Sequence, residues 1–290
     1  MSAPYVSVVV PTCGRADLLA RCLEALEHQT LARSHYEIIV ADDSELRSGP
    51  AAARNRGWRK ARAPIVAFTD DDTVPAPDWL ERGLEAMKED IDAASGRIVM
   101  PIPAAPTDYE RDAQGLEHSE FVTANCFVRR RVLERLGGFD EGFRMAWRED
   151  SDLHFSLLKT GARLVHAPRA VVVHPVRPAG WAVSMKQQRK VMYDALLFKK
   201  HRALYRARIR AGARWDYYVI VASLAAALAG SMPAALLWAL LTGRFFLQRM
   251  RGTSKRPAHV AEMLVTSALI PPLAVFWRLA GALRYRVAFL

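Results

Sequence analysis

The stretch Ala67-Phe68-Thr69-Asp70-Asp71-Asp72-Thr73 decides the fold of this chain. It continues an apolar run that starts at Pro64, and such a run predicts a short buried strand. Three successive carboxylates at a strand end repel one another unless a positive charge lies among them. A hard divalent cation such as Mg²⁺ or Mn²⁺ takes oxygen ligands and is often shared with phosphate oxygens. The other interpretation is a solvated acidic turn before the helix expected from Asp78.

Strands and helices are expected to alternate on both sides of this stretch. Apolar runs predict further strands at 5–10, 36–41, 93–100, 121–128 and 171–174. Helical patterns are expected at 18–26, 49–63, 78–87, 131–136 and 152–159, and a loop rich in proline and polar residues at 101–115. This alternation predicts an α/β fold with an open, mostly parallel, Rossmann-like sheet.

Polar residues directly follow three of the predicted strands. Pro11 and Thr12 follow the first, Asp42 ends the second, and the acidic triplet follows the third. Ligands of open α/β sheets bind at the carboxyl ends of the strands, so these residues are expected to share one site. Neither a dinucleotide-binding glycine fingerprint nor a phosphate-loop lysine motif is present, which disfavours a nicotinamide enzyme.

The net charge of +11 over 290 residues predicts an anionic partner. Most of the excess lies in one segment, because residues 177–216 contain eleven lysines and arginines and only two aspartates. The segment from Trp181 to about Arg210 has the pattern of a basic amphipathic helix with a possible break. It contains few aromatic side chains on which bases could stack, so nucleic-acid binding is not expected.

The C-terminal part of the chain changes to an apolar composition. Val219–Thr242 carries no charge and is long enough to cross a hydrocarbon core of about 30 Å, although Pro233 near its middle should kink or split it. Met263–Trp277 is short for a span and contains Pro271-Pro272. Basic residues flank both stretches, which favours re-entrant or interfacial helices or a kinked transmembrane hairpin. Buried helices of a soluble helical domain are the alternative.

Six short motifs follow one another in a fixed order over residues 5 to about 175. They are Val8-Val9-Val10-Pro11-Thr12, Ile39-Val40-Ala41-Asp42-Asp43-Ser44, Ala53-Arg54-Asn55-Arg56-Gly57, Phe68-Thr69-Asp70-Asp71-Asp72, Gly137-Gly138-Phe139-Asp140-Glu141 and Glu149-Asp150-Ser151-Asp152-Leu153. The ordered set resembles the family 2 glycosyltransferases, which have the GT-A fold. The resemblance implies a nucleotide-sugar-binding catalytic domain at 1–180, followed by the basic helical segment at 181–215 and apolar helices at 216–290.

The resemblance implies roles in donor binding for several residues. The first strand end holds the base and ribose in this family, which points to Pro11, Thr12 and Arg15 here. The carboxylate after the second strand hydrogen-bonds the base, which points to Asp42. Arg54 is similar to a residue that contacts the base or the diphosphate. The alternatives are a turn or cap role for Asp42 and a solvated helix-face position for Arg54.

The acidic triplet resembles the family's DXD metal motif. The resemblance implies that Asp70 faces the ribose and that Asp72 binds Mg²⁺ or Mn²⁺, while Asp71 remains ambiguous. His174 ends the last predicted strand, where a histidine joins the metal in some GT-A enzymes. A structural role for this histidine is the alternative.

The Glu149-Asp150 pair resembles the family's general-base motif, and the resemblance implies that Asp150 takes the acceptor proton. Asp152 is the competing residue. Two positions on a helix differ by about 200°, so Asp150 and Asp152 cannot both face one substrate, and we expect Asp152 to cap its helix. Trp147 and Trp181 are candidates for apolar walls of the acceptor site, with ordinary packing as the alternative.

The resemblance implies an inverting glycosyltransferase with a nucleotide-sugar donor, preferably of the UDP type. The motif of processive polysaccharide synthases is incomplete at Gln187-Gln188-Arg189-Lys190, so transfer of a single sugar is expected. The basic segment and apolar helices favour a lipid-linked or cell-surface glycan acceptor and a location at the cytoplasmic face of the cell membrane, on anionic lipids. A nucleotidyltransferase of similar fold and a non-enzymatic basic membrane- or nucleic-acid-binding protein are the alternatives.

Overall fold

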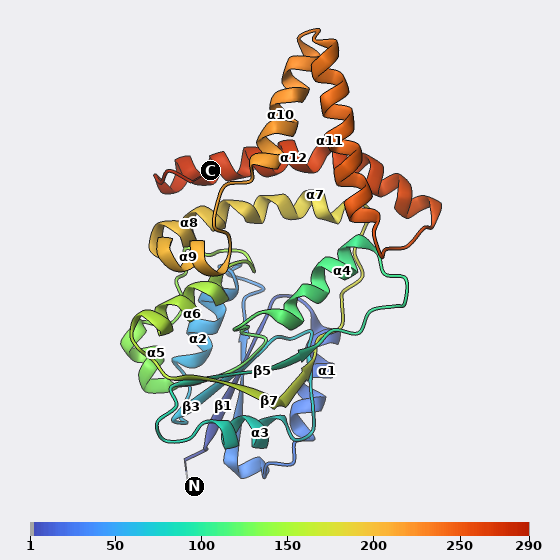
Figure 1. Ribbon diagram of the computed structural model, residues 1–290. Coiled ribbons are helices and arrows are strands. Elements are labelled where there is room, and N and C mark those ends of the chain that lie inside the picture. The colour runs from blue at the N-terminus through green and yellow to red at the C-terminus, as the bar shows by residue number, and fades with distance from the viewer. Residues whose placement is uncertain (1–2, 290) are drawn as a thin grey trace. The chain divides into compact units, whose positions relative to one another are not determined.

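The structure is a computed structural model that describes residues 3–289, and it divides into two compact units. The first unit contains the chain up to Pro101 together with Gln114–Val176. The second contains Ile102–Ala113 and the chain from Arg177 onward. Figure 1 shows both units, with the sheet in the first and only helices labelled in the C-terminal part of the second.

The first unit is built on a mixed sheet that has seven strands within the described residues, in the order β2-β1-β3-β6-β5-β7-β4. Strand β1 pairs in parallel with β2 and β3, and β5 pairs in parallel with β7. Strand β6 is antiparallel to both β3 and β5, and β4 is antiparallel to β7. The strands are β1 (Val6–Thr12), β2 (Tyr36–Asp42), β3 (Ile65–Thr69), β4 (Val74–Pro75), β5 (Ala93–Val99), β6 (Asn125–Arg129) and β7 (Leu164–Val173). The predicted α/β fold is confirmed, but the sheet is mixed rather than mostly parallel, because β6 runs antiparallel to both of its neighbours and β4 runs antiparallel to β7.

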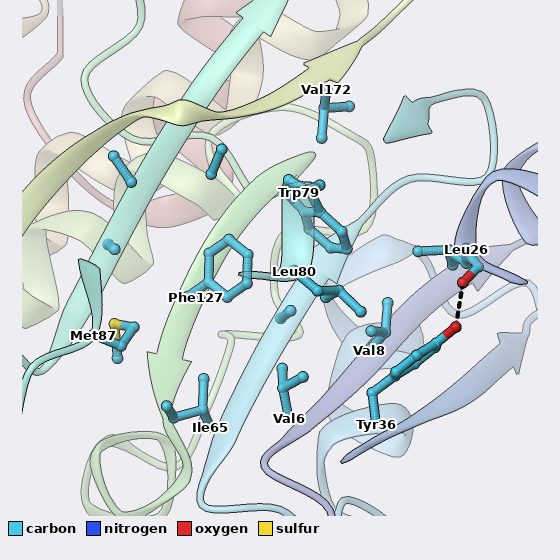
Figure 2. Packing of buried hydrophobic residues seen from close by; sticks show 14 of the residues in the cluster. Val6, Val8, Leu26, Tyr36, Ile65, Trp79, Leu80, Met87, Phe127 and Val172 are labelled. Atoms are coloured by element: carbon cyan, nitrogen blue, oxygen red, sulfur yellow. Dashed lines mark hydrogen bonds between the residues drawn. The ribbon is translucent and has the colours of Figure 1, made fainter. Parts of the chain in front are cut away.

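Apolar side chains are buried on both faces of this sheet. Val6 and Val8 of β1 pack into one core with Trp79 and Phe127, whereas Val9 packs into the opposite core with Phe68. Figure 2 shows the first core, in which the Tyr36 hydroxyl donates a hydrogen bond of 2.6 Å to the Leu26 carbonyl. Burial of successive β1 residues on opposite faces explains why its sequence is continuously apolar. The helices of this unit are α1 (Ala16–Glu27), α2 (Pro50–Trp58), α3 (Trp79–Ala86), α5 (Arg130–Leu136) and α6 (Glu149–Lys159).

The segment 101–115, expected to be a loop, contains helix α4 (Asp108–Gln114). Thr107 and Glu110 form a reciprocal cap before it: the Glu110 carboxylate accepts from the Thr107 N–H at 2.7 Å, and the Thr107 hydroxyl accepts from the Glu110 N–H at 3.2 Å. This is a capping box, whose Thr-x-x-Glu pattern was visible in the sequence. The loop prediction was wrong here because the flanking prolines hid that signal.

Helix α6 begins at Glu149, three residues earlier than expected. Its N-cap is Arg148, with a left-handed φ of 75°, so the expectation that Asp152 caps the helix was wrong. Glu149, Asp150 and Asp152 all lie in the first turn, where carboxylates interact favourably with the helix dipole. Glu149 and Asp150 therefore project from a helix rather than from a loop.

The second unit is helical after Arg177. The long basic helix expected at 181–210, for which a break was allowed, is divided into α7 (Val183–Gln187), η3 (Gln188–Val191), α8 (Met192–Lys200) and α9 (Arg202–Arg208). The split expected near Pro233 is confirmed, because α10 (Trp215–Leu228) and α11 (Met232–Met250) are separate helices. Helix α12 (Pro257–Tyr285) runs through Pro271 and Pro272 and is longer than the apolar stretch suggested. Among the described helices, α12 alone is long and apolar enough to cross a membrane by length and composition.

Candidate active site

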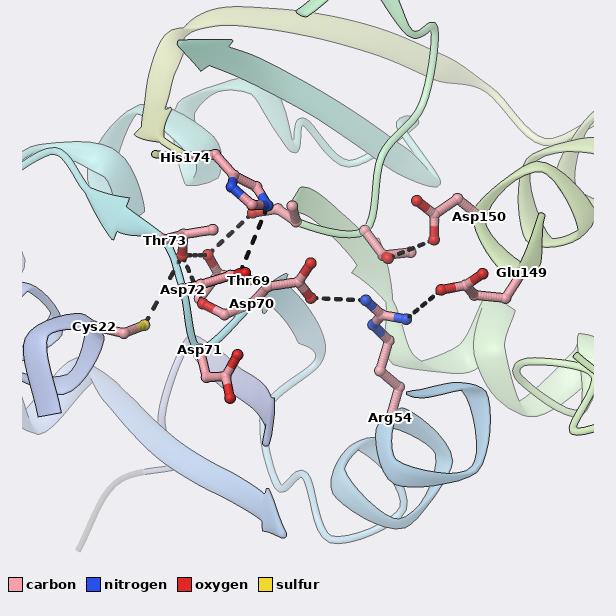
Figure 3. A network of polar contacts seen from close by, with 12 residues as sticks. Cys22, Arg54, Thr69, Asp70, Asp71, Asp72, Thr73, Glu149, Asp150 and His174 are labelled. Carbon is pink, nitrogen blue, oxygen red and sulfur yellow. Dashed lines mark hydrogen bonds and ion pairs between the residues drawn. The ribbon is translucent and has the colours of Figure 1, made fainter. Parts of the chain in front are cut away.

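Arg54 lies at the centre of a buried network of acids at the carboxyl edge of the sheet (Figure 3). The residue is only 3% exposed. One of its guanidinium nitrogens donates to Asp70 Oδ1 at 2.7 Å, and the other donates to Glu149 Oε1 at 3.1 Å. Helix α2, the end of β3 and the start of α6 thus converge on one side chain. Burial rules out the solvated helix-face alternative for Arg54.

Charge pairing fixes the ionisation of this network. Burial by itself lowers the pKa of Arg54, but Asp70, Asp150 and Glu149 together raise it above its ordinary value. Burial raises the pKa of Asp70, whereas Arg54, His174 and other positive groups outweigh it and leave the pKa below its ordinary value. Asp70 is therefore an anion at neutral pH, and Arg54 is its counter-ion.

Glu149 and Asp150 are adjacent on α6, about 100° apart around the helix axis, and their carboxylates contact different partners. Glu149 is 4% exposed, and burial and repulsion from Asp150 raise its pKa to about 8 despite the pairing with Arg54. Asp150 Oδ1 accepts a hydrogen bond of 2.6 Å from the Thr123 hydroxyl. Burial raises the pKa of Asp150 too, although Arg54 and Thr123 oppose the shift. Thr123 was not among the predicted site residues, because no local pattern marks a threonine that contacts a residue 27 positions away.

The Asp71 side chain points away from this network. It connects the turn after β3 to the end of β1 through a hydrogen bond with Thr12. It is fully buried, and its Oδ2 accepts hydrogen bonds from the Thr12 hydroxyl at 2.6 Å and from Arg15 Nε at 2.9 Å. Burial raises the pKa of Asp71, and the contacts with Thr12 and Arg15 lower it. The ambiguous member of the triplet is thus an internal partner of Thr12 and Arg15. The structure brings all three of these predicted site residues together.

Asp70, Asp72 and His174 form a group that can hold a metal ion. One ligand atom from each lies within 4.8 Å of the others, and His174 Nε2 is 3.6 Å from Asp72 Oδ1. His174 follows β7 directly, and its N–H donates to the Val99 carbonyl at 2.8 Å, which fixes its backbone. Its Nδ1 is a buried atom without a hydrogen-bond partner in the described chain. The two carboxylates are oxygen ligands that suit Mn²⁺ or Mg²⁺, so these residues fit the expected metal.

Asp42 lies at the same edge of the sheet but has a separate set of contacts. Parallel register places it beside Thr12, and Pro11 precedes Thr12 in buried strand β1. The Asp42 carboxylate is exposed and accepts hydrogen bonds of 2.9 Å from both the N–H and the hydroxyl of Ser44, which lower its pKa. This turn leaves the carboxylate at the surface beside the strand end.

Asp43, which was not among the predicted site residues, is the buried carboxylate of this loop. It accepts hydrogen bonds from the Ser48 hydroxyl at 2.5 Å, the Gly49 N–H at 2.8 Å and Arg56 at 2.7 Å. These bonds fix the entry into α2 and so the position of Arg54. The Asp42-Asp43 pair is visible in the sequence, but only the packing of the fold shows that Asp43 is buried and Asp42 is exposed.

Two further motifs meet through Asn55. Its amide group donates to the Phe139 carbonyl at 2.9 Å, and its Oδ1 accepts from the Phe139 N–H at 2.9 Å and from Trp58 Nε1 at 2.8 Å. The asparagine therefore anchors the Gly-Gly-Phe-Asp-Glu turn to α2. Trp147, before α6, is 37% exposed with the Arg148 guanidinium 4.7 Å from its ring centre.

Comparisons with known proteins agree with this geometry. The family model for glycosyl transferase family group 2 matches residues 65–280, and that for glycosyl transferase family 2 matches residues 7–48. Glycosyltransferase AglE of Haloferax volcanii is 28% identical over 213 residues, which cover 61% of this chain and 69% of that protein. The pre-mycofactocin glycosyltransferase of Mycobacterium tuberculosis is 31% identical over 204 residues, but this chain spans only 43% of its length.

A solved structure shares the fold. The mannosyltransferase PcManGT from Pyrobaculum calidifontis, in complex with GDP-Man and Mn²⁺, superposes with a TM-score of 0.58. The match covers 96% of this chain and 88% of that one at 21% sequence identity. The sheet and helices described above thus have the GT-A arrangement.

Proposed function

This chain belongs to the family 2 glycosyltransferases, enzymes that use nucleotide-sugar donors, and from that membership we propose an inverting, metal-dependent transfer of one sugar. The acceptor is a hydroxyl group of a lipid-linked or cell-surface glycan, and Asp150 is the general base. The observation that carries the proposal is the convergence of Asp70, Asp72, His174 and the Glu149-Asp150 pair at one sheet edge, with Arg54 between the acids.

Asp150 is favoured over Glu149 as the base because Glu149 already accepts a hydrogen bond from Arg54. Glu149 is buried against Arg54, whereas Asp150 is half-buried and retains a carboxylate oxygen beyond the one that Thr123 contacts. Its raised pKa brings it closer to the working pH, which suits a group that must accept a proton from a hydroxyl. A base on the side opposite the leaving nucleotide gives inversion at the anomeric carbon.

The metal ligands in this proposal are Asp72 and His174, with Asp70 beside them facing the ribose. A bound Mg²⁺ or Mn²⁺ would act as a Lewis acid that stabilises negative charge on the departing diphosphate. Arg54 keeps Asp70 ionised, and Asp71 ties the turn that carries Asp72 to the end of β1.

The donor-binding residues in this proposal are Pro11, Thr12, Arg15 and Asp42 at the first two strand ends. An exposed Asp42 carboxylate can accept an N–H from uracil, so a UDP-sugar is the preferred donor. Guanine also presents an N–H to an acid, and the likeness to a protein solved with GDP-Man makes a GDP-sugar the first alternative. Trp147, which lies two residues before α6 and is exposed, is proposed to line the acceptor side.

The proposed location is the cytoplasmic face of the cell membrane. The domains are proposed as catalytic at 1–180, basic at 181–215 and membrane-associated at 216–290. The basic excess at 177–216 would contact anionic lipids, where each lysine or arginine near the surface contributes about 1 kcal/mol. No role in nucleic-acid binding is proposed.

The test is a panel of UDP-, GDP- and dTDP-sugars with Mn²⁺, Mg²⁺ or EDTA and a set of lipid-linked acceptors. We expect one nucleoside diphosphate to be released in a metal-dependent way, and NMR of the product to show an inverted anomeric configuration. Retention would contradict the Asp150 assignment. Release of pyrophosphate from a nucleoside triphosphate and a sugar phosphate, without diphosphate release from any sugar nucleotide, would favour the nucleotidyltransferase.

A further inference from the structure

Large apolar side chains are exposed mainly on three helices of the second unit. The most exposed of them include Leu228 at 82%, Met232 at 71%, Leu240 at 72% and Leu283 at 82%. In water such a surface is costly, and a concentration of this kind marks a membrane or protein contact. All of these residues belong to α10, α11 and α12.

Helices α10 and α11 form an antiparallel pair, which we call the apolar arm (Trp215–Met250). No charged residue lies between Asp216 and Arg244. Gly230, with a φ of +96°, makes the turn at the tip, and the Ser231 hydroxyl caps α11. Figure 1 shows the pair rising from the middle of α12, with the turn at its far end.

Only the base of the arm is packed against α12. Tyr217 and Ile220 of α10 join a cluster with Ile270 and Ala274 of α12, and Phe245 of α11 packs against it. In the stretch from Leu224 to Leu237, all of which the structure describes, no residue is buried. The outer half of the arm thus consists of apolar residues that the rest of its own unit leaves uncovered.

The arm is too short to cross a bilayer. Helix α10 has 14 residues, which at 1.5 Å per residue is about 21 Å, against a hydrocarbon core of about 30 Å. Helix α11 has 19 residues, but its part before Arg244 (232–243) is only about 18 Å long. Because the two helices are antiparallel, both ends of the arm return to one side. Trp215, 63% exposed, and Tyr218 lie at the base with Arg210, Arg244 and Arg251 nearby in sequence. Aromatic and basic residues of this kind gather at the headgroup level.

Helix α12 is long enough to cross a bilayer, but the helices packed against it make a crossing unfavourable. It packs along η3 and α8, and Gly281 lies so close to Met192 that a Cβ would be 2.6 Å from the Met192 carbonyl. The Arg189 guanidinium of η3 is 5.8 Å from the Trp277 ring centre. A spanning α12 would carry these basic segments into the hydrocarbon, which is costly.

An exposed apolar stripe runs along α12 on the side away from its buried residues. Its members recur at intervals of three, four or seven, which places them on one face of a helix. They are Val265, Leu269, Phe276, Leu279 and Leu283. A helix with such a stripe and a packed opposite face lies in the plane of the interface.

We propose that the apolar arm inserts into one leaflet of an anionic bilayer as a re-entrant hairpin, while α12 lies flat at the headgroup level. The partner is the lipid surface, and no segment of the chain crosses to the far side at the arm or at α12. This topology refines the membrane association in the proposed function but does not depend on sugar transfer.

Cysteine labelling of the full chain tests this topology. The native Cys13 is exposed and marks the side of the first unit, while Cys22 and Cys126 are buried. Ala258→Cys and Arg284→Cys report the two ends of α12, and Ser231→Cys reports the tip of the arm. Inside-out membrane vesicles and intact spheroplasts from expressing cells are treated with an impermeant maleimide, and peptide mass spectrometry assigns the label.

We expect both α12 variants to be labelled with Cys13 in inside-out vesicles and protected in spheroplasts. The Ser231→Cys variant should be protected in both until detergent is added. Labelling of one end of α12 in each preparation would overturn the flat orientation. Labelling of the tip in spheroplasts would overturn the re-entrant arm, and recovery of the chain as a soluble oligomer would overturn both.

Vesicle flotation with a matched pair of variants gives a second measurement. Leu240→Glu places a charge on the exposed face of the arm, and we expect about a tenfold or greater loss of partitioning into vesicles of neutral and anionic lipid. Leu46→Glu makes the same change at a leucine of the first unit that is 67% exposed and should leave partitioning unchanged. Equal behaviour of the two variants would contradict the proposal. Correct topology without any sugar transfer would count only against the proposed function.

Discussion

Arg54 lies between Asp70 and Glu149 and donates a hydrogen bond to each of these acids. It pairs with Glu149 on one side and Asp70 on the other, so each carboxylate has a defined charge and direction. The neighbouring Asp150 is left with Thr123 as its hydrogen-bond donor and an environment that disfavours its anion. At the scale of single residues, Asp70 and Glu149 each accept a hydrogen bond from Arg54, and Asp150, the proposed general base, accepts one from Thr123.

Asp150→Asn should lower kcat by about 10²- to 10⁴-fold, because the amide keeps the shape but cannot accept the acceptor proton. Donor affinity should stay within about twofold, since the residue is not proposed to bind the nucleotide. Steady-state kinetics and calorimetric titration with the donor measure the two effects. Asp90→Asn, the same change at a surface aspartate paired with Arg163, is the control and should keep full activity. A large loss of donor affinity would place Asp150 elsewhere in the mechanism.

Glu149 should make stability depend on pH. Its pKa is about 8 in the folded chain against an ordinary value of 4.5, so between these limits the folded state binds more protons than the unfolded state. The stabilisation that protonated Glu149 contributes is fully present below pH 4.5. It falls by up to about 1.4 kcal/mol per pH unit above that pH and is lost as the pH rises through about 8. Urea unfolding of the metal-free protein from pH 5 to 8 measures the slope.

Glu149→Gln removes this proton and should flatten that slope. Glu134→Gln, an exposed glutamate of α5, is the matched control and should leave the slope unchanged. If the Glu149→Gln variant keeps the pH dependence of the parent chain, the proton belongs to another group.

At the scale of elements, α2 organises the site because two loops are tied to it. Asp43 fixes its entry, and Asn55 holds the turn that follows α5. Gly57 permits close packing, since a Cβ there would lie 2.3 Å from a Val9 methyl. The helix is therefore held against β1 while its Arg54 reaches the acids.

Gly138 and Gly137 allow a matched test of this arrangement. Both have left-handed φ values, +80° and +77°, but a Cβ at Gly138 would lie 2.4 Å from Asn55 Oδ1 whereas Gly137 has open space. Gly137→Ala should cost about 1 kcal/mol for backbone strain alone. Gly138→Ala should cost at least about 3 kcal/mol, because strain is added to the loss of the Asn55 contacts. Chemical denaturation measures both, and similar costs would mean that Asn55 does not hold the turn.

At the scale of the whole molecule, charge is distributed unevenly. The net charge of +11 arises largely from residues 177–216, next to the apolar arm in sequence. Exposed charges are screened by salt over about 10 Å at 0.1 M and 3 Å at 1 M, whereas apolar insertion is not.

Salt should therefore separate the two contributions to membrane binding. Raising the salt concentration from about 0.1 M to 1 M should weaken binding of the full chain to anionic vesicles severalfold. Binding to neutral vesicles should change little, because the arm enters the lipid without charge. Flotation at each salt concentration measures both. Loss of binding to both kinds of vesicle would show that the arm does not insert.

The sequence by itself determined the class of fold, the order of the longer strands along the chain and the identity of most candidate site residues, although it did not predict β4. Apolar runs that form strands, glycines at turns and acidic residues at strand ends are local patterns. Local patterns can be recognised in the sequence without knowledge of the fold. The split at Pro233 was predicted for the same reason, and the capping box before α4 could have been.

Only the tertiary structure decided which acids share which partner. Asp71 pairs with Thr12 and Arg15, Glu149 with Arg54, and Asp150 with Thr123, across separations of 27 to 95 residues. Burial likewise distinguished Asp43 from Asp42, and the packing of α12 along α8 is the observation behind its proposed flat orientation. These contacts form between segments that are distant in the sequence. The free energy of burying a charge or an apolar face therefore depends on which segments pack together in the fold, and not on neighbours along the chain.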